Sequence, residues 1–477
     1  MTNRRDFLKQ ACAAAALTGV PARIWGAAKM LDKPDLVIGL LSDIHISVRA
    51  KTDPVKATAM FRHALEYFRD RHVDGVLVSG DLANAGLEPE LKAVADAWFA
   101  VFPDGKLPDG SPVANLMHYG DHDAEHRFYT DGLKQGFIKA GEPVPRSLSE
   151  NEHRKEVWEA CFREPWSPLR HVRVKGYDFV LSNFMREGGR SAPCDLEQQL
   201  RAMDLDPDKP FFFSQHRYIG TTYRCKEEMW GGDNGVTEKV MPKFPNAVVF
   251  QGHTHYMLTD DCGVWIGPFI AINNGSLLNQ APGRQRENGV DISWYRTDYM
   301  RETQMRCLNE RQAHGGMVMT LKGDVAVLER RDFASDLPLG PDLVFSVSPA
   351  KRARFTDAAR KAASIAPEFP AGAKVTVSER KGKDRRGRPT DQVVVTFPTV
   401  RSSGKRPRAY DYIVRAEKAD GTLVKEKRVF SPCINCPEEK EPAESTCVFS
   451  KAETAGATVY GVRPANCWNV AGAEIRG

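Results

Sequence analysis

The chain has 477 residues, of which 42% are hydrophobic and 27% are charged, and its net charge is +5. Such a length predicts more than one domain, with enough apolar residues for a sizeable core. The small net charge does not favour a nucleic-acid-binding protein. A membrane-spanning helix needs about 20 apolar residues in a row, and beyond the N-terminus no such run is present, so we expect no transmembrane span in the mature chain.

The N-terminus has the pattern of an export signal. Two arginines precede Phe7-Leu8-Lys9, an apolar run extends from Ala11 to Val20, and small residues lead to Gly26-Ala27-Ala28. This order is typical of a secretory signal peptide, and the paired arginines resemble the bacterial twin-arginine signal. We therefore expect a signal over residues 1–28, export by the twin-arginine machinery and a periplasmic or secreted protein. An uncleaved amphipathic helix is the alternative.

Strands and helices are expected to alternate after this segment. Apolar residues at spacings of three and four predict helices over residues 57–68 and 88–102. Apolar runs predict strands at residues 35–41, 75–79, 114–119, 171–174, 177–183, 210–215, 247–251, 264–272 and 317–328. The first of these elements follow the order strand, helix, strand, helix, strand, which indicates an α/β domain with a largely parallel sheet.

Polar side chains follow five of these strands at the point where each strand ends. The five clusters are Asp43 with His45, Asp81, Asp121 with His122, His216, and His253 with His255. Open α/β sheets bind ligands at the carboxyl ends of their strands, and carboxylates with imidazoles suit Mn, Fe or Zn. A single cluster also fits a polar turn, and His216 alone also fits a core histidine. Their recurrence predicts a site for two divalent metal ions, with Asp81 as the bridging carboxylate.

These clusters are similar to the motifs of the calcineurin-like metallophosphoesterases. The family series D-x-H, G-D, G-N-H-D, H and G-H-x-H is matched by Asp43-Ile44-His45, Gly80-Asp81, Gly120-Asp121-His122-Asp123, His216 and Gly252-His253-Thr254-His255. The first and last motifs most resemble the phosphodiesterase-like branch, which acts on cyclic nucleotides and glycerophosphodiesters. The resemblance covers residues 34–335 and implies a four-layer α/β/β/α sandwich with the metal site between its two sheets.

The resemblance also implies a role for each of these residues. One ion would be held by Asp43, His45, Asp81 and His255, and the other by Asp81, Asp121, His216 and His253. A water activated by the ions would attack phosphorus, His122 would protonate the leaving oxygen or steady the developing charge, and Asp123 would orient His122. The implied enzyme is a metal-dependent phosphoesterase that hydrolyses small-molecule or cell-envelope phosphate esters, with diesters favoured over monoesters.

One residue departs from the family pattern, because Asp121 stands where the family has Asn. An aspartate can ligate a hard metal, but it cannot donate the hydrogen bond that an amide offers to a phosphate oxygen. It also adds negative charge near an anionic substrate. Losing one charge-assisted hydrogen bond costs about 1.5–3 kcal/mol. The alternative function is therefore an attenuated or non-catalytic protein that uses the same fold to bind cell-envelope phosphates.

The residue pattern of the sequence changes from about residue 342. Strand patterns there are separated by two basic stretches, Arg380–Arg388 and Arg401–Arg408. We expect residues 342–477 to form a small all-β sandwich, which faintly resembles fibronectin type III-like modules. The basic stretches fit solvated loops or contacts with an anionic surface. Four cysteines lie near the end of the chain: Cys433, Cys436, Cys447 and Cys467. In an exported protein we expect them to form disulfides, and a structural zinc site is the alternative.

Overall fold

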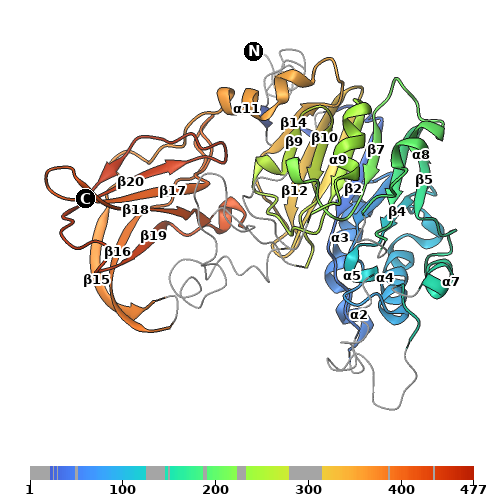
Figure 1. The fold of residues 1–477 in the computed structure, drawn as a ribbon, viewed down its shortest axis with the longest axis horizontal. Coiled ribbons are helices and arrows are strands. Elements are labelled where there is room, and N and C mark those ends of the chain that lie inside the picture. Colours follow the sequence, from blue (N-terminus) through green and yellow to red (C-terminus); the bar gives the residue numbers. More distant parts are fainter. Residues whose placement is uncertain are drawn as a thin grey trace.

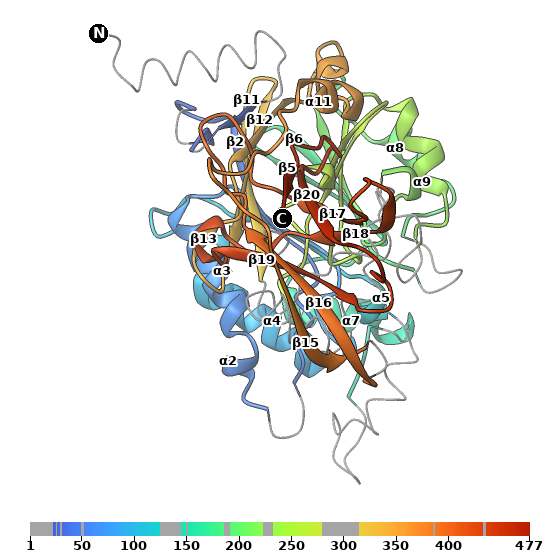
Figure 2. The same cartoon turned by 90° about the vertical axis from the view of Figure 1, so that its left-hand side faces the viewer.

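The computed structural model describes residues 22–24, 26–28, 31–48, 52–124, 145–148, 151–185, 191–222, 232–278, 314–384, 387–432 and 436–477. Two large sheets with flanking helices form an α/β core, and two smaller sheets form a C-terminal lobe beside it (Figure 1). Viewed from the side of the lobe, the C-terminal strands lie in front of the core (Figure 2). No helix within the ranges given above combines the length and apolarity that crossing a bilayer requires.

The first core sheet has eight strands. Its order is β1-β14-β12-β11-β2-β3-β4, with β13 paired to β12. Strands β2, β3 and β4 are parallel to one another, so their carboxyl ends reach the same edge. The strands are β1 (Ala22–Ile24), β2 (Leu36–Leu41), β3 (Gly75–Ser79), β4 (Ala114–His118), β11 (Gly315–Lys322), β12 (Val325–Asp332), β13 (Leu337–Pro338) and β14 (Asp342–Ser346).

The second core sheet has six strands in the order β5-β6-β7-β8-β10-β9. Strands β6, β7, β8 and β10 are parallel, and the edge strands β5 and β9 run antiparallel to their neighbours. The strands are β5 (Leu169–Val174), β6 (Tyr177–Ser182), β7 (Phe211–Ser214), β8 (Ala247–Gln251), β9 (Val264–Ile266) and β10 (Ile270–Asn273). The apolar run at 264–272 is therefore two strands rather than one, and the run at 317–328 likewise divides into β11 and β12.

Apolar side chains on both faces of each sheet produce four layers. Along β2, Ile38 and Leu40 pack towards the second sheet, in one cluster with Phe212 and Phe250. The alternate residue Val37 packs in the cluster formed with the helices on the outer face, as the period of two along a strand requires. The core helices are α2 (Pro54–Ala57), α3 (Ala59–Asp70), α4 (Glu88–Val101), α5 (Asp121–Ala124), α7 (Asn151–Phe162), α8 (Leu196–Ala202) and α9 (Val236–Val240).

Helices α3, α4 and α7 contribute to the cluster on the first sheet, whereas α8 and α9 contribute to a separate cluster on the second sheet. The order of layers is therefore helix, sheet, sheet, helix. This arrangement confirms the α/β/β/α architecture that the motifs imply.

The C-terminal lobe consists of two antiparallel sheets, one in the order β15-β16-β19 and one in the order β18-β17-β20-β21. Val395 and Phe397 of the first share an apolar core with Tyr412 and Val414 of the second. The predicted all-β sandwich is confirmed. The strands are β15 (Thr376–Lys383), β16 (Pro389–Pro398), β17 (Asp411–Glu417), β18 (Leu423–Phe430), β19 (Glu444–Ser450), β20 (Val459–Ala465) and β21 (Ile475–Arg476), and α11 (Asp357–Ala363) precedes them.

Strands β1 and β14 shift both predicted domain boundaries. β14, which the sequence assigns to the C-terminal module, pairs with β12 in the first core sheet. β1, which the sequence assigns to the signal peptide, pairs with β14. Ala27 and Ala28 are buried against Val327 and Val344. The strands predicted from the sequence do not include these five residues, and only the long-range pairing shows which sheet β14 joins.

The lobe contacts the core through buried polar groups. The Arg408 guanidinium donates to the carbonyl oxygen of Leu339 at 2.7 Å and to the Glu441 carboxylate at 2.7 Å. The Tyr410 hydroxyl donates to the Asp260 carboxylate at 2.9 Å. Arg408 is only 6% exposed. The last residue of the basic stretch 401–408 is therefore a contact between lobe and core, rather than part of a solvated loop.

The described C-terminal cysteines occupy different environments. Cys447 is a free thiol, fully buried in the sandwich core, and burial raises its pKa to about 12. Cys467 lies at the contact with the core, where Cys262 Sγ is 3.5 Å from its carbonyl oxygen. The disulfide prediction is therefore wrong for Cys447, because its thiol is packed in the lobe core. Cys433 lies outside the described residues.

Removing residues 1–28 is expected to destabilise the core, whereas removing residues 1–21 is not. The longer deletion removes β1 and the buried Ala27 and Ala28, and it exposes the edge of β14. The loss of about 1–2 kcal/mol should lower Tm by roughly 2–8 °C. Differential scanning calorimetry of the two truncated proteins measures this difference. Equal Tm values would show that β1 adds no stability.

Candidate metal centre

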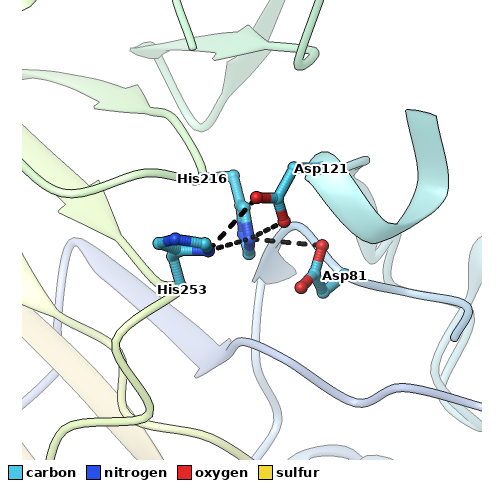
Figure 3. A group of neighbouring side chains, drawn as sticks. All are labelled: Asp81, Asp121, His216 and His253. Atoms are coloured by element: carbon cyan, nitrogen blue, oxygen red, sulfur yellow. Dashed lines mark hydrogen bonds and ion pairs between the residues drawn. The ribbon is translucent and has the colours of Figure 1, made fainter. Parts of the chain in front are cut away.

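The five polar clusters meet where the carboxyl ends of the two core sheets converge. Strands β2, β3 and β4 lead into the aspartates and into His45, and β7 and β8 lead into the other histidines. All of the predicted metal ligands are buried. Ligand atoms lie within 4.8 Å of one another in two main groups: Asp81, Asp121, His216 and His253 (Figure 3), and Asp43, His45 and His255. These are the ligand sets implied by the motifs, apart from the sharing of Asp81.

Asp81 lies between the two groups. Its Oδ1 atom is 3.2 Å from His216 Nε2, and its Oδ2 atom is 3.4 Å from His45 Nε2. A third group, formed by Asp81 with His45 and His122, also meets the 4.8 Å limit. One carboxylate therefore faces histidines of both groups, as a residue shared by two ions must.

The Asp43 carboxylate has one oxygen occupied and one directed to the cluster. Its Oδ2 atom accepts hydrogen bonds from Ser42 Oγ at 2.5 Å and from the His253 amide at 3.0 Å. Its Oδ1 atom lies 3.2 Å from His255 Nε2. Within the described part of the chain, this buried oxygen has no hydrogen-bond partner. A bound cation would satisfy it.

The Asp121 carboxylate is divided in the same way. Arg217 donates to Oδ2 from Nε at 3.0 Å and from Nη2 at 2.7 Å. The Oδ1 atom is 3.2 Å from His216 Nε2, and among the described residues it is also a buried oxygen without a hydrogen-bond partner. Buried polar atoms of this kind are costly unless a partner is present. The donor set therefore fits a cation at this second group as well.

The electrostatics of the site favour positive charge. Burial by itself lowers the pKa of His216, but the carboxylates of Asp81 and Asp121 raise it well above its usual range. Burial by itself raises the pKa of Asp43, but His255 and further histidines hold it well below its usual range. The carboxylates thus remain ionised in a buried space, which is the environment that attracts a divalent cation.

A hydrogen bond fixes the ring of His216. Its Nδ1 atom lies 2.7 Å from the Ser79 carbonyl oxygen. Because a carbonyl only accepts, Nδ1 carries the proton and donates it. Nε2 then faces Asp81 and Asp121. Bonds of this kind set the tautomer of metal-binding histidines in proteins.

The backbone is strained at most of the predicted ligands. Positive φ angles are uncommon for residues other than glycine and cluster at functional sites. Five of the seven predicted ligands have them: Asp43 (51°), His45 (44°), Asp81 (53°), His253 (68°) and His255 (51°). The turns at the strand ends are thus held in an unfavourable conformation that brings these side chains together.

His122 and Asp123 are placed differently from each other. His122 Nδ1 lies 3.0 Å from the Asn84 carbonyl oxygen and so donates to it, and its amide donates to Asp81. The Asp123 carboxylate accepts from the amides of Leu82, Ala83 and Gly120. The backbone carbonyl, rather than Asp123, therefore orients His122. Asp123 binds together the loops after β3 and β4, because its carboxylate points to amides of the main chain.

Four residues near the centre were not predicted as part of it. Ser42 and Arg217 are sequence neighbours of Asp43 and His216 and bond to Asp43 and Asp121. Asn84 orients His122 through its carbonyl group, which no sequence pattern reveals. Asn274 donates to Ser79 Oγ at 2.7 Å. The sequence of its segment, Asn273-Asn274-Gly275, fits either a turn or the lining of a cleft. The hydrogen bond places Asn274 beside the last residue of β3.

The family model of the calcineurin-like phosphoesterases matches residues 36–257 of this chain. The match begins at β2 and ends just after the last histidine of the cluster. Residues 36–257, which form most of the α/β core, therefore have the metallophosphoesterase fold and are similar to the calcineurin-like phosphoesterases, as the motifs indicate. The family acts on phosphate esters, and its domain here carries clusters of Asp and His that can hold metal.

Solved structures give distant likenesses. A predicted phosphoesterase from Streptococcus pneumoniae TIGR4 is 12% identical with a TM-score of 0.24, covering 65% of this chain and 97% of that chain. Vacuolar Protein Sorting 29 from Cryptosporidium parvum is 14% identical with a TM-score of 0.28 and the same coverages. An archaeal phosphodiesterase is 15% identical with a TM-score of 0.23, covering 51% and 85%. Scores this low carry no weight for function. No curated protein gives a significant match.

Gly252→Ala is expected to disrupt the centre. A Cβ atom at this position would lie 1.9 Å from Ser42 Oγ and 2.8 Å from Asp43 Oδ2, so Asp43 must move. We expect at least a tenfold weaker affinity for Mn²⁺, measured by isothermal titration calorimetry of metal-free protein. Gly220→Ala is the control, because a Cβ atom there meets nothing within 4 Å. Equal affinities in the two variants would contradict the steric role of Gly252.

Glu90 is expected to make stability depend on pH. Burial raises its pKa to about 8, although the amides of Ala85, Leu87 and Val48 lower it. The folded state thus binds a proton that the unfolded state, with a pKa of about 4.5, releases. This stabilisation is complete below pH 4.5 and is lost as the pH rises to about 8. The Tm of the Glu90→Gln variant should fall less between pH 5 and pH 8 than that of the wild type. Parallel Tm curves would contradict the assignment.

Proposed function

We propose that this protein is an exported phosphoesterase that uses two divalent metal ions, Mn, Fe or Zn, to hydrolyse phosphate esters. The observation that carries the proposal is the paired cluster of carboxylates and imidazoles that shares Asp81. We propose phosphodiesters as the main substrates and phosphomonoesters as weaker ones. This preference rests on the resemblance of the first and last motifs to those of the phosphodiesterase-like branch.

Two ions bound at the seven ligands would supply Lewis-acid activation of water and of the phosphate group. Side chains and a backbone carbonyl of the protein supply the other functions of the site. Asp81 aligns the two halves of the site, and the loop carbonyl of Asn84 keeps a proton on His122 Nδ1. His122 would use its other ring nitrogen to protonate a leaving oxygen or to steady developing charge.

The non-catalytic alternative rests on the extra negative charge of Asp121. In the structure this charge is paired with Arg217, whose Nη2 lies 2.7 Å from Oδ2. The family's neutral Asn is thus replaced by a pair of opposite charges. This pairing removes the electrostatic objection to binding an anionic substrate and favours the enzyme over a purely binding protein.

Export and the role of the C-terminal lobe belong to the same proposal. The twin-arginine pattern at Arg4-Arg5 supports export to the periplasm or outside the cell. Because β1 pairs in the core sheet, we propose that the signal is cut before Ala22. The lobe, with its faint resemblance to fibronectin type III-like modules, would hold the segment around Asp260 that follows the last ligand motif.

Hydrolysis of bis-p-nitrophenyl phosphate and p-nitrophenyl phosphate tests the proposal. Protein stripped with a chelator and reloaded with Mn²⁺, Fe²⁺ or Zn²⁺ should bind two ions and hydrolyse the diester faster than the monoester. Asp81→Ala should lose metal and lower kcat/KM by at least about 10³-fold. His122→Gln should keep both ions and lose about 10²–10⁴-fold in kcat, the usual contribution of an acid–base group.

His72→Ala is the matched control, because this histidine is exposed and lies outside the clusters. Two bound ions without turnover of either ester would refute the enzyme. Retention of full activity in Asp81→Ala would refute the assignment of the site.

A further inference from the structure

Arg217 follows directly after the ligand His216 and contacts Asp121 across the site. Two of its nitrogens, Nε and Nη2, donate to the same carboxylate oxygen, Oδ2. Its guanidinium carbon also lies 4.7 Å from the centre of the Phe184 ring. The Arg217 side chain is 16% exposed and that of Asp121 is 5% exposed. The ion pair is therefore a largely buried contact with a fixed orientation.

The contact determines how Asp121 is used. Arg217 donates two hydrogen bonds to Oδ2, whereas Oδ1 lies 3.2 Å from His216 Nε2. Oδ2 also lies 3.5 Å from His253 Nδ1, but Arg217 holds it, so Oδ1 is the carboxylate oxygen left without a hydrogen-bond partner among the described residues, in the place that the amide oxygen of an asparagine would take. Its charge is also paired, so the neighbourhood of Asp81 gains less negative charge than an isolated aspartate would bring.

We propose that Arg217 is a positioning residue that makes the carboxylate of Asp121 compatible with binding a phosphate group at the metal centre. This inference rests on the proposed function, which supplies the phosphate site. It adds that Arg217 sets the net charge of that site. Arg217 acts through Asp121: it holds Oδ2 and offsets one negative charge, and the phosphate then meets a centre of the same net charge as one built with asparagine.

The expected size of the effect follows from Coulomb's law. An unpaired charge about 5 Å from a phosphate, at an effective dielectric constant of about 20, changes its affinity by about 10²-fold. Screening at the partly exposed edge of the site reduces this value, so we expect a change of about 10-fold to 100-fold. Removing a positive charge does not weaken the binding of cations, so the metal content should stay the same.

The experiment measures the binding of inorganic phosphate to the metal-loaded protein by isothermal titration calorimetry, with metal content determined on the same samples. Arg217→Gln should raise the Kd of phosphate by about 10-fold to 100-fold with both ions retained. Arg217→Lys keeps the charge and should stay within about fivefold of the wild type. The double variant Asp121→Asn with Arg217→Gln should recover phosphate affinity to within about fivefold of the wild type.

Arg201→Gln is the matched control, because Arg201 also pairs with a carboxylate, Glu197, but on the exposed face of α8. It should leave the Kd of phosphate unchanged. Three results would overturn the proposal: an unchanged Kd in Arg217→Gln, the loss of an ion in that variant, or a double variant that binds phosphate no better than Arg217→Gln. A purely structural role would give no such recovery.

The measurement separates this inference from the proposed function. Phosphate binding needs no turnover, so the pattern of Kd values can hold even if no ester is hydrolysed. Conversely, if esters are hydrolysed but all variants bind phosphate equally well, the phosphoesterase assignment stands and the positioning role of Arg217 is refuted.

Discussion

The crowding of three carboxylates in a buried space is the constraint on which the structure depends. Asp43, Asp81 and Asp121 are each no more than 3% exposed, and Asp81 lies between the histidines that group with Asp43 and those that group with Asp121. Like charges that are held close together in a buried space repel strongly, because little water screens them. Each carboxylate is therefore partly satisfied by the protein: a hydroxyl and an amide bind Asp43, an amide binds Asp81, and a guanidinium binds Asp121.

The fold provides this crowding by bringing two parallel-stranded sheet edges together. The strands themselves are ordinary apolar segments, and the positive φ angles of the predicted ligands lie in the turns that follow them. Tight packing at these turns leaves no room for added atoms. A Cβ atom at Gly120 would lie 2.4 Å from Asp81 Oδ1. The glycines of the motifs are thus required by the closeness of neighbouring ligands, and not simply by the shape of each turn.

The C-terminal lobe is connected to this centre through the segment after the last ligand motif. Asp260 accepts from Tyr256 of the core and from Tyr410 of the lobe. Arg330 of β12 donates to the Leu258 carbonyl and to Asp261 in the same segment. Strand β14, expected in the lobe, belongs to the core sheet, so the chain enters the lobe only after completing the sheet that carries β2.

The sequence by itself determined the alternation of strands and helices in the core, the all-β nature of the lobe and the clusters of the candidate metal centre, whereas the four layers followed from the resemblance of those clusters to a known family. These features are readable because apolar periodicity marks the strands and each ligand stands at a strand end. Tertiary structure alone decided which sheet β1 and β14 join, that Asp123 binds loops instead of His122, and that Arg217 pairs with Asp121. Each of these features depends on a backbone group or on a contact between segments far apart in the chain. Long-range contacts and backbone groups leave no pattern in the local sequence.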